Sequence, residues 1–360
     1  RVEFDNERDQ IQKAVCPQNV QDVVYGSHRL PKQVLYTGRT DGNLRNLTWG
    51  DGGGWPNDFT FVFYDNDALD ETMRHFSKML RGLVDGDVYA AYNMLRPWAY
   101  RADLWRYCIL WACGGVYVDS KLAIAEPFYD FLEKIGFNED ALGDNDIPQI
   151  YSCRDDLASE SMVADLDIDK FSCIWQGLLI AEPRSPSLLR TIQWVVHKIQ
   201  RRWYPPFEDF EMPWLFLTGP GAIALATQLD DPNWESHVRL RCRMTYTPKT
   251  QLREPLHNPH LVGDWHLIPG TNYSVYDGDM SHSSFIADAG LHETQRTNDY
   301  GKLFKSHMIY MDDIFNETFA NQFRRPPPHK HWPSKHWGHL APGHVPRYGT
   351  HGPVRHPRVV

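Results

Sequence analysis

The chain has 360 residues, of which 42% are hydrophobic, and a formal net charge of −9. This length and composition are enough for one large α/β domain, or two small ones, with an apolar core. The negative charge argues against a general nucleic-acid-binding protein, because phosphate contacts need a basic surface. No run of about eighteen apolar residues occurs, so the sequence predicts no membrane-spanning helix.

The composition divides the chain into three parts. Residues 1–30 are polar with little periodicity, and we interpret them as a surface stem or lead-in. Residues 31–323 contain the periodic segments and predict the folded domain. Residues 324–360 contain seven histidines and many prolines but no acidic residue, so they predict a mobile basic tail that cannot form a core.

The start of the chain and its cysteines bear on the compartment. The sequence begins at Arg1 rather than at a methionine, so we expect a signal peptide or a membrane anchor upstream. Six cysteines in a chain of this size give little indication of the redox environment. Cys108 and Cys113 lie five residues apart on one predicted helix and point to different faces, so we expect buried thiols rather than a disulfide.

The first half of the domain alternates strands and helices. Residues 30–38 predict a first strand and residues 59–64 a second, and the apolar spacing over residues 69–83 predicts a helix. Residues 41–57 are rich in glycine. They lack the lysine and the following helix that a phosphate-binding loop needs, so we interpret them as a surface loop.

The most informative stretch comes next. Apolar residues recur at intervals of three and four over residues 102–113, which predicts a helix. Gly114 and Gly115 are expected to end it, because glycine adopts left-handed backbone angles without a Cβ clash. The β-branched and aromatic residues 116–118 then predict a strand. This strand delivers Asp119 to its carboxyl end, the edge where ligands bind in α/β sheets.

Asp103 and Arg106 share one face of this predicted helix. Taken alone, the spacing is typical of a surface ion pair of small energetic weight. The pair also lies beside a buried strand that ends in another carboxylate. That setting suits a site in which sugar hydroxyls and a diphosphate are held together.

The later chain is less regular. Residues 136–169 are acidic and irregular, and we interpret them as an insertion that forms a lid or an acceptor wall. Residues 173–180 predict a strand and residues 183–200 an amphipathic helix. A tight turn at residues 217–221 is expected to open a further helix over residues 222–229.

The motifs around Asp103 and Asp119 resemble glycosyltransferase family 32, whose donor-binding segment is a sugar-binding region containing a DXD motif. The matching sequences are ADLWRY at residues 102–107 and GGVYVD at residues 114–119. The chain departs from the family pattern at Lys121, which stands where the second aspartate is expected.

This resemblance implies an α/β fold of the GT-A type, with a mixed central sheet flanked by helices. It also implies a retaining glycosyltransferase that moves a hexose from a UDP- or GDP-sugar to a glycan, glycoprotein or glycolipid acceptor. The expected location is the lumen of the Golgi or the secretory pathway, with a type II membrane anchor upstream. Nucleic acid is not an expected partner.

The resemblance further implies roles for individual residues. Asp103 would hold hydroxyls of the donor sugar, and Arg106 would orient the donor. Asp119 would bind Mn²⁺, and Lys121 would either weaken that metal site or neutralise the diphosphate directly. The other residues expected to bind substrate are Tyr36, Thr37, Arg101, Gly114, Gly115, Tyr117, Gln176, Thr218 and Gly219.

Mn²⁺ would stabilise the negative charge that develops on the departing diphosphate. Many nucleotide-sugar enzymes of this architecture use a histidine late in the chain as a metal ligand. His282 and His307 are the candidates here, and an ordinary surface position is the alternative for both.

Other function classes remain open. A pseudoenzyme or lectin-like binder would keep the sugar pocket without turnover, and Lys121 supports that alternative. An interaction protein would act through residues 324–360 and would not depend on Asp119. A glycoside hydrolase would need a defined pair of carboxylates, which the sequence does not single out.

Overall fold

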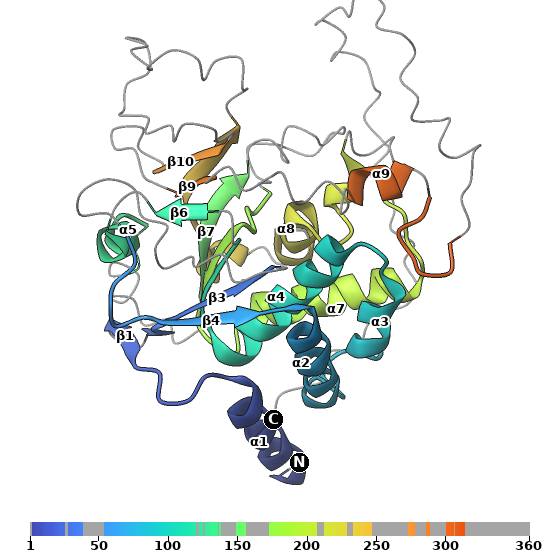
Figure 1. Cartoon of the computed structure of the whole chain (residues 1–360), viewed down its shortest axis with the longest axis horizontal. Coiled ribbons are helices and arrows are strands. Elements are labelled where there is room, and N and C mark those ends of the chain that lie inside the picture. The colour runs from blue at the N-terminus through green and yellow to red at the C-terminus, as the bar shows by residue number, and fades with distance from the viewer. Residues whose placement is uncertain are drawn as a thin grey trace, which may run out of the picture.

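The computed structural model is built on a mixed sheet with helices on both of its faces (Figure 1). It describes residues 2–25, 28–38, 54–119, 122–124, 127–135, 137, 149–155, 173–206, 212–228, 233–246, 273–277, 286–288, 300–305 and 307–313. The expected tail at residues 324–360 and most of the glycine-rich loop lie outside these ranges, so their assignments stay predictions. Within the described residues, no helix is long and apolar enough to cross a membrane.

Seven strands form the central sheet. In spatial order they are β10 (Tyr273–Asp277), β9 (Val238–Tyr246), β7 (Ile150–Asp155), β8 (Leu178–Ala181), β5 (Gly115–Val118), β3 (Gln33–Thr37) and β4 (Thr60–Tyr64). β3 runs parallel to both β4 and β5, and β8 runs antiparallel to β5 and β7. The carboxyl ends of β3, β4 and β5 therefore meet at one edge of the sheet, and Asp119 follows β5 there.

Two antiparallel strand pairs lie outside the main sheet. β1 (Asp22–Tyr25) pairs with β2 (His28–Pro31), and β6 (Leu122–Ile124) pairs with β11 (Ile286–Asp288). The second pair brings a late segment of the chain next to the residues that follow Asp119. β7 corrects one expectation, because it lies within residues 136–169, which we interpreted as an irregular insertion, and forms an internal strand of the sheet.

Helices cover the sheet and form two apolar cores. The helices are α1 (Val2–Val15), α2 (Asn66–Met79), α3 (Val88–Met94), α4 (Trp98–Cys113), α5 (Phe128–Lys134), α7 (Pro186–Gln200), α8 (Pro220–Gln228) and α9 (Tyr300–Lys305), with short 3₁₀ helices η3 (Pro213–Leu215) and η4 (Trp234–Ser236). The larger core contains residues from α1 to α4, α7 and α8, and the smaller one contains α5. Neighbouring strand residues alternate between the two cores, as Val116 and Tyr117 do in β5.

α4 is the central helix of the larger core. Every residue from Asp103 to Cys113 is buried, so this helix is apolar almost all round rather than amphipathic. It ends at Gly114 and Gly115, which have φ angles of 64° and 93°. A Cβ atom on Gly114 would lie 2.7 Å from Pro183, and one on Gly115 would lie 2.9 Å from the Gln33 carbonyl oxygen. The glycine pair is therefore needed for both the backbone turn and the close packing behind β5.

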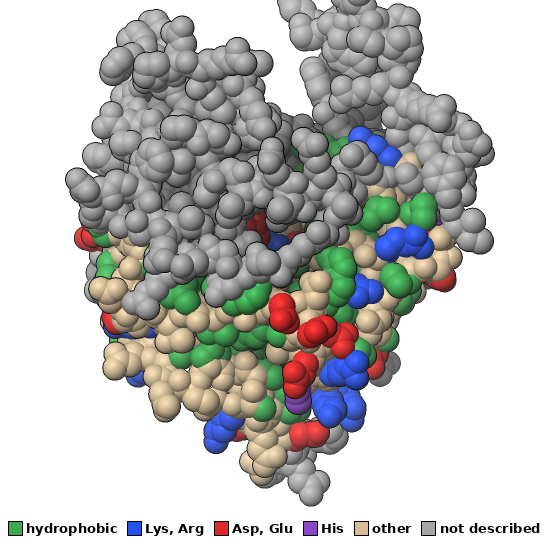
Figure 2. Space-filling view, in the orientation of Figure 1, with side chains coloured by type: hydrophobic (Ala, Val, Ile, Leu, Met, Phe, Trp, Pro, Cys, Tyr) green, Lys and Arg blue, Asp and Glu red, His purple; other side chains and the backbone are tan. Residues whose placement is uncertain are grey.

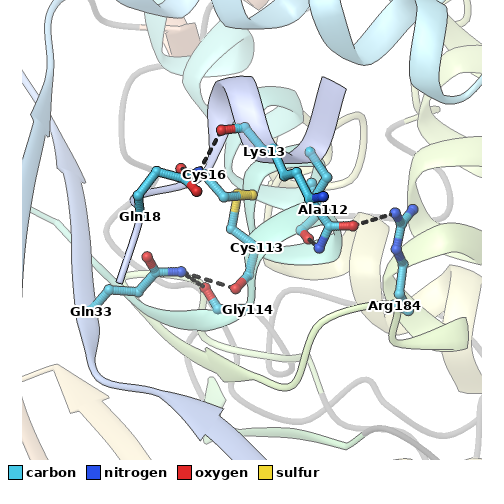
Figure 3. Close-up of a disulfide and its surroundings, with 9 residues drawn as sticks. Lys13, Cys16, Gln18, Gln33, Ala112, Cys113, Gly114 and Arg184 are labelled. Atoms are coloured by element: carbon cyan, nitrogen blue, oxygen red, sulfur yellow. Dashed lines mark hydrogen bonds between the residues drawn. A yellow bond between two sulfur atoms is a disulfide. The ribbon is translucent and has the colours of Figure 1, made fainter. Parts of the chain in front are cut away.

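The N-terminal residues are part of the domain rather than a separate stem. Ile11 and Val15 of α1 are buried in the same core as α4. Cys16 forms a disulfide with Cys113 at the end of α4, across a sequence separation of 97 residues (Figure 3). The expectation of a buried thiol is wrong for Cys113, whereas Cys108 is a free, buried cysteine as expected.

Side chains close the end of α4 beside this disulfide (Figure 3). Gln12 donates to the Ala112 carbonyl oxygen at 2.7 Å, and Gln33 donates to the carbonyl oxygens of Cys113 and Gly114 at 2.9 Å. These bonds satisfy carbonyl groups that have no partner within the helix. α1, β3 and the start of β5 are thereby joined at one point.

Candidate active site

The candidate site forms where β5 ends and the side chains of α4 face it. Val118 is the last residue of β5, and the backbone N–H of Asp119 donates to the Gly177 carbonyl oxygen at 2.8 Å. Tyr117, Asp103 and Arg106 complete the group around Asp119. The sequence motifs at residues 102–107 and 114–119 are thus brought to one place.

Asp103 and Arg106 form a buried ion pair. Arg106 Nη2 lies 2.9 Å from Asp103 Oδ1, and the two side chains are 7% and 8% exposed. The pair on α2 between Asp70 and Arg74 has the same length, yet its arginine is 63% exposed, and Figure 2 shows acidic and basic side chains side by side over that helix. Asp103 and Arg106 are therefore not a surface ion pair of small energetic weight.

Arg106 is fixed on several sides. Its Nη1 donates to the Gln176 carbonyl oxygen at 2.6 Å, and its guanidinium lies 4.4 Å from the ring centre of Tyr117. Nη2 also lies 3.6 Å from Asp119 Oδ1. One cation thus stands between two carboxylates, which keeps both in place at the edge of the sheet.

Asp119 is the carboxylate of this group that is open to solvent, with 29% of its side chain exposed. The Tyr117 hydroxyl donates to Asp119 Oδ1 at 2.9 Å, the same oxygen that faces Arg106. Among the residues that the structure describes, no side chain forms a hydrogen bond or an ion pair with Oδ2. The carboxylate is held through one oxygen, and part of its side chain faces solvent.

Burial sets the electrostatics of the group. It raises the pKa of Asp103 to about 6, although Arg106 and Thr218 favour the charged form. Burial alone would lower the pKa of Arg106, but Tyr117 and the two carboxylates outweigh it, and the net shift is upward. Burial also keeps the pKa of Tyr117 well above its ordinary value, so its hydroxyl stays protonated and donates.

A turn from another part of the chain completes the group. The Thr218 hydroxyl donates to Asp103 Oδ2 at 2.8 Å. The Tyr107 hydroxyl lies 2.7 Å from both Gln176 Oε1 and the Thr218 carbonyl oxygen, so these two acceptors share its proton. A Cβ atom on Gly219 would lie 3.3 Å from Gln176 Nε2. Three separate segments therefore meet α4 through buried polar contacts.

Other residues that the sequence singled out lie in other settings. Tyr36 is buried in the smaller core, with its ring centre 5.4 Å from that of Phe63. Thr37 donates to the Tyr64 carbonyl oxygen at 2.7 Å, at the ends of β3 and β4. Arg101 donates to the Leu95 carbonyl oxygen at 2.6 Å and lies over the ring of Trp98. None of these contacts involves the pair of Asp103 and Arg106.

Of the two histidines expected as metal ligands, the structure describes His307. The ring of His307 stacks on Tyr204 at 4.1 Å between centres, beside α9. Lys121 and His282 lie outside the described residues, so their roles stay predictions. Within the described part of the chain, no group of three or more histidine, cysteine or acidic side chains could hold a metal ion.

Tyr107 is the residue of the site that the sequence analysis missed as a site residue. It is fully buried, and burial holds its pKa well above the ordinary value. Its spacing in the sequence could have identified it, because it lies four residues after Asp103 and therefore on the same helix face. Its apolar neighbours made it resemble an ordinary core tyrosine.

The comparison with known protein families agrees with this geometry. Residues 57–142 match the family described as glycosyltransferase sugar-binding region containing DXD motif. The match spans α2, α3, α4 and β5, and therefore includes Asp103, Arg106 and Asp119. The resemblance found in the sequence is confirmed over these residues. Together with the mixed sheet flanked by helices, it confirms the expected fold of the GT-A type.

Other comparisons add little. No curated protein matches the chain closely enough to count as a relative. Among solved structures, the chain is similar to one titled "PaToxG Glycosyltransferase", with 13% sequence identity, a TM-score of 0.33, and coverage of 65% of this chain and 82% of that one. A likeness of this strength is too weak to indicate a shared fold.

Residues 57–142 are therefore similar to a glycosyltransferase sugar-binding region, and this match supports glycosyl transfer as the general class of activity. Domains with a DXD motif typically bind a divalent metal. The described residues fit such an ion in part, because Asp119 offers a carboxylate oxygen at an exposed edge and hard cations prefer oxygen ligands.

Proposed function

We propose that the protein is a retaining glycosyltransferase that moves a hexose from a UDP- or GDP-sugar to a glycan, glycoprotein or glycolipid acceptor. The observation that supports this most is the buried pair of Asp103 and Arg106 set against the partly exposed Asp119 at the sheet edge. A carboxylate among apolar walls accepts hydrogen bonds from sugar hydroxyls, and the adjacent guanidinium fixes its direction. The exposed carboxylate lies where a diphosphate and its counter-ion would meet.

Each residue has a distinct task in this proposal. Asp103 accepts hydrogen bonds from donor hydroxyls, and Arg106 keeps that carboxylate charged and oriented. Asp119 would hold Mn²⁺, which when bound supplies positive charge against the leaving diphosphate. Tyr117 donates to Asp119 and fixes its rotamer. Lys121 follows two positions later in the sequence, and we propose that it adds a second positive charge near the diphosphate.

We also propose that the protein works in the lumen of the secretory pathway. The disulfide between Cys16 and Cys113 supports this location, because such bonds form and persist in oxidising compartments. Cys153 is disulfide-bonded as well, and its strand β7 belongs to the central sheet.

Donor binding is the direct test of the proposed function. We expect one UDP- or GDP-hexose, in the presence of Mn²⁺, to raise the melting temperature of the wild-type protein. The stabilisation is about 2.7 kcal/mol at one hundred times the dissociation constant. Asp119→Asn keeps the size of the side chain but loses its charge, so this stabilisation should disappear.

The control for that test is Asp70→Asn, which removes a partly exposed carboxylate that pairs with Arg74 on α2 and should leave donor stabilisation intact. If a donor stabilises the protein without Mn²⁺, we would assign the proposed role of the metal to Lys121. A donor that binds but is never transferred would identify a pseudoenzyme. If no nucleotide sugar stabilises the folded protein, the proposed function is wrong.

The pH dependence of transfer should follow Asp103. Its pKa is about 6 in the folded protein, so we expect kcat/KM to fall as the pH drops through about 6 and to be constant above it. The sign follows from the charge, because the protonated carboxyl no longer attracts Arg106 and accepts sugar hydroxyls less strongly. Donor affinity from melting temperatures at each pH should show the same dependence. Asp103→Asn should weaken binding at all pH values and remove this acid limb.

A further inference from the structure

Thr218 is held at both of its polar ends by one face of α4. Its hydroxyl donates to Asp103 Oδ2 at 2.8 Å, and its carbonyl oxygen lies 2.7 Å from the Tyr107 hydroxyl. Asp103 and Tyr107 are four residues apart, so they project from the same side of the helix in successive turns. Thr218 itself has no exposed surface.

We propose that Thr218 is a positioning residue for Asp103, and that the turn before α8 thereby sets the carboxylate that receives the donor sugar. This inference rests on the proposed function. Arg106 contacts Oδ1 and Thr218 contacts Oδ2, so the two partners together fix the rotation of the carboxylate plane. Each carboxylate oxygen accepts more than one hydrogen bond, so a donor hydroxyl still finds a free lone pair.

The turn that presents Thr218 has little freedom to move. A Cβ atom on Gly219 would lie 2.6 Å from the Leu215 carbonyl oxygen, and one on Gly221 would lie 2.1 Å from the ring of Phe216. The neighbouring residues Phe216 and Leu217 are fully buried in the larger core. A shift of the turn would therefore displace packed side chains, and Thr218 is a rigid partner rather than an adaptable one.

The contacts of Thr218 differ from those of a residue that binds substrate directly. The proton of the Thr218 hydroxyl is already used by Asp103, and no surface of the residue faces solvent. The resemblance implied that Thr218 itself binds substrate. Instead, its hydrogen bond reaches the carboxylate to which we assign donor recognition, so Thr218 acts through Asp103.

The experiment compares Thr218→Val with Thr218→Ser in the full chain. Valine keeps the shape of threonine but lacks the hydroxyl, whereas serine keeps the hydroxyl and loses a methyl group. A hydrogen bond to a charged group is strong enough that its loss should raise the KM for the nucleotide sugar by about tenfold or more. Serine should restore most of the affinity, and the KM for the acceptor should change little.

Thr227→Val is the matched control. Thr227 is another fully buried threonine, one that donates to the Ile223 carbonyl oxygen within α8 at 2.7 Å. The same substitution there should leave the KM for the donor unchanged. Asp103→Asn supplies the second control, because Thr218→Val should add almost nothing to the loss of donor affinity in that background.

Several outcomes would overturn the proposal. It is wrong if serine is as impaired as valine, if valine raises only the KM for the acceptor, or if its effect is unchanged in the Asp103→Asn background. The wild type, Thr218→Val, Asp103→Asn and the variant that combines both substitutions form a double-mutant cycle, and all four proteins are also unfolded with urea. If the wild type binds no nucleotide sugar, the proposed function fails, and additive effects on unfolding would then overturn the link between Thr218 and Asp103 as well.

Discussion

Replacing Arg106 with methionine is expected to lower the free energy of unfolding by about 3 to 5 kcal/mol at neutral pH, and to abolish donor binding. Methionine fills similar space but leaves the buried Asp103 without the cation 2.9 Å from its oxygen. It also removes the hydrogen bond to the Gln176 carbonyl oxygen. Urea unfolding and donor melting-temperature shifts measure the two effects.

The loss should depend on pH in a defined direction. Arg106 lowers the pKa of Asp103, so its removal raises that pKa above the present value of about 6. A carboxyl whose folded pKa is raised binds a proton more tightly in the folded state, which favours folding at low pH and is lost as the pH rises through that pKa. The cost of Arg106→Met should therefore be largest near pH 7 and smaller near about pH 5.

Arg101→Met on the same helix is the control. Arg101 is half-buried and lies over the rings of Trp98 and Tyr92. Its loss should cost only about 1 to 2 kcal/mol, because it removes two cation–π contacts and one hydrogen bond to backbone. An equal cost for the two variants, or a pH-independent cost for Arg106→Met, would contradict the assigned role of Arg106.

Removing the disulfide with Cys16→Ala should have a comparable effect on stability. The bond closes a loop of 97 residues, for which restriction of the unfolded chain corresponds to about 4.7 kcal/mol. Ile11 and Val15 of α1 would also lose a covalent hold on the core. We expect a lower urea midpoint and rapid proteolysis within residues 2–15. Reduction of the wild-type protein should shift the midpoint at least as far, because it also breaks the disulfide of Cys153.

Cys108→Ala provides the comparison for this variant. Cys108 is a free cysteine buried in α4, so its replacement leaves a small cavity and should cost about 1 kcal/mol, with α1 still protected from protease. If Cys16→Ala is no less stable than Cys108→Ala, α1 is held by packing alone and the disulfide contributes little.

The local features of the site were predictable from the sequence. The end of α4 at Gly114, the strand after it and the place of Asp119 follow from backbone preferences within a few residues. The shared face of Asp103 and Arg106 follows from helical spacing in the same way. These predictions needed no contact between distant parts of the chain, which is why they agree with the structure.

The remaining features depend on contacts that no local pattern encodes. The disulfide joins residues 97 positions apart, and Thr218 reaches Asp103 across 115 positions. α1 looked like a polar lead-in because, among its side chains from residue 6 onward, Ile11 and Val15 are the ones buried in the core. β7 was missed because acidic residues around it concealed a short, almost fully buried strand.

The disulfide and the candidate site lie at opposite ends of β5. Cys113 lies just before β5 and Asp119 just after it, so a strand of four residues, about 13 Å long, separates the covalent cross-link from the candidate site. α1 lies at the bottom of Figure 1, at the opposite end of the molecule from β9 and β10. A force applied through α1 would be transmitted by the disulfide to the carboxyl end of α4. The candidate site lies at the other end of β5 from this point of attachment.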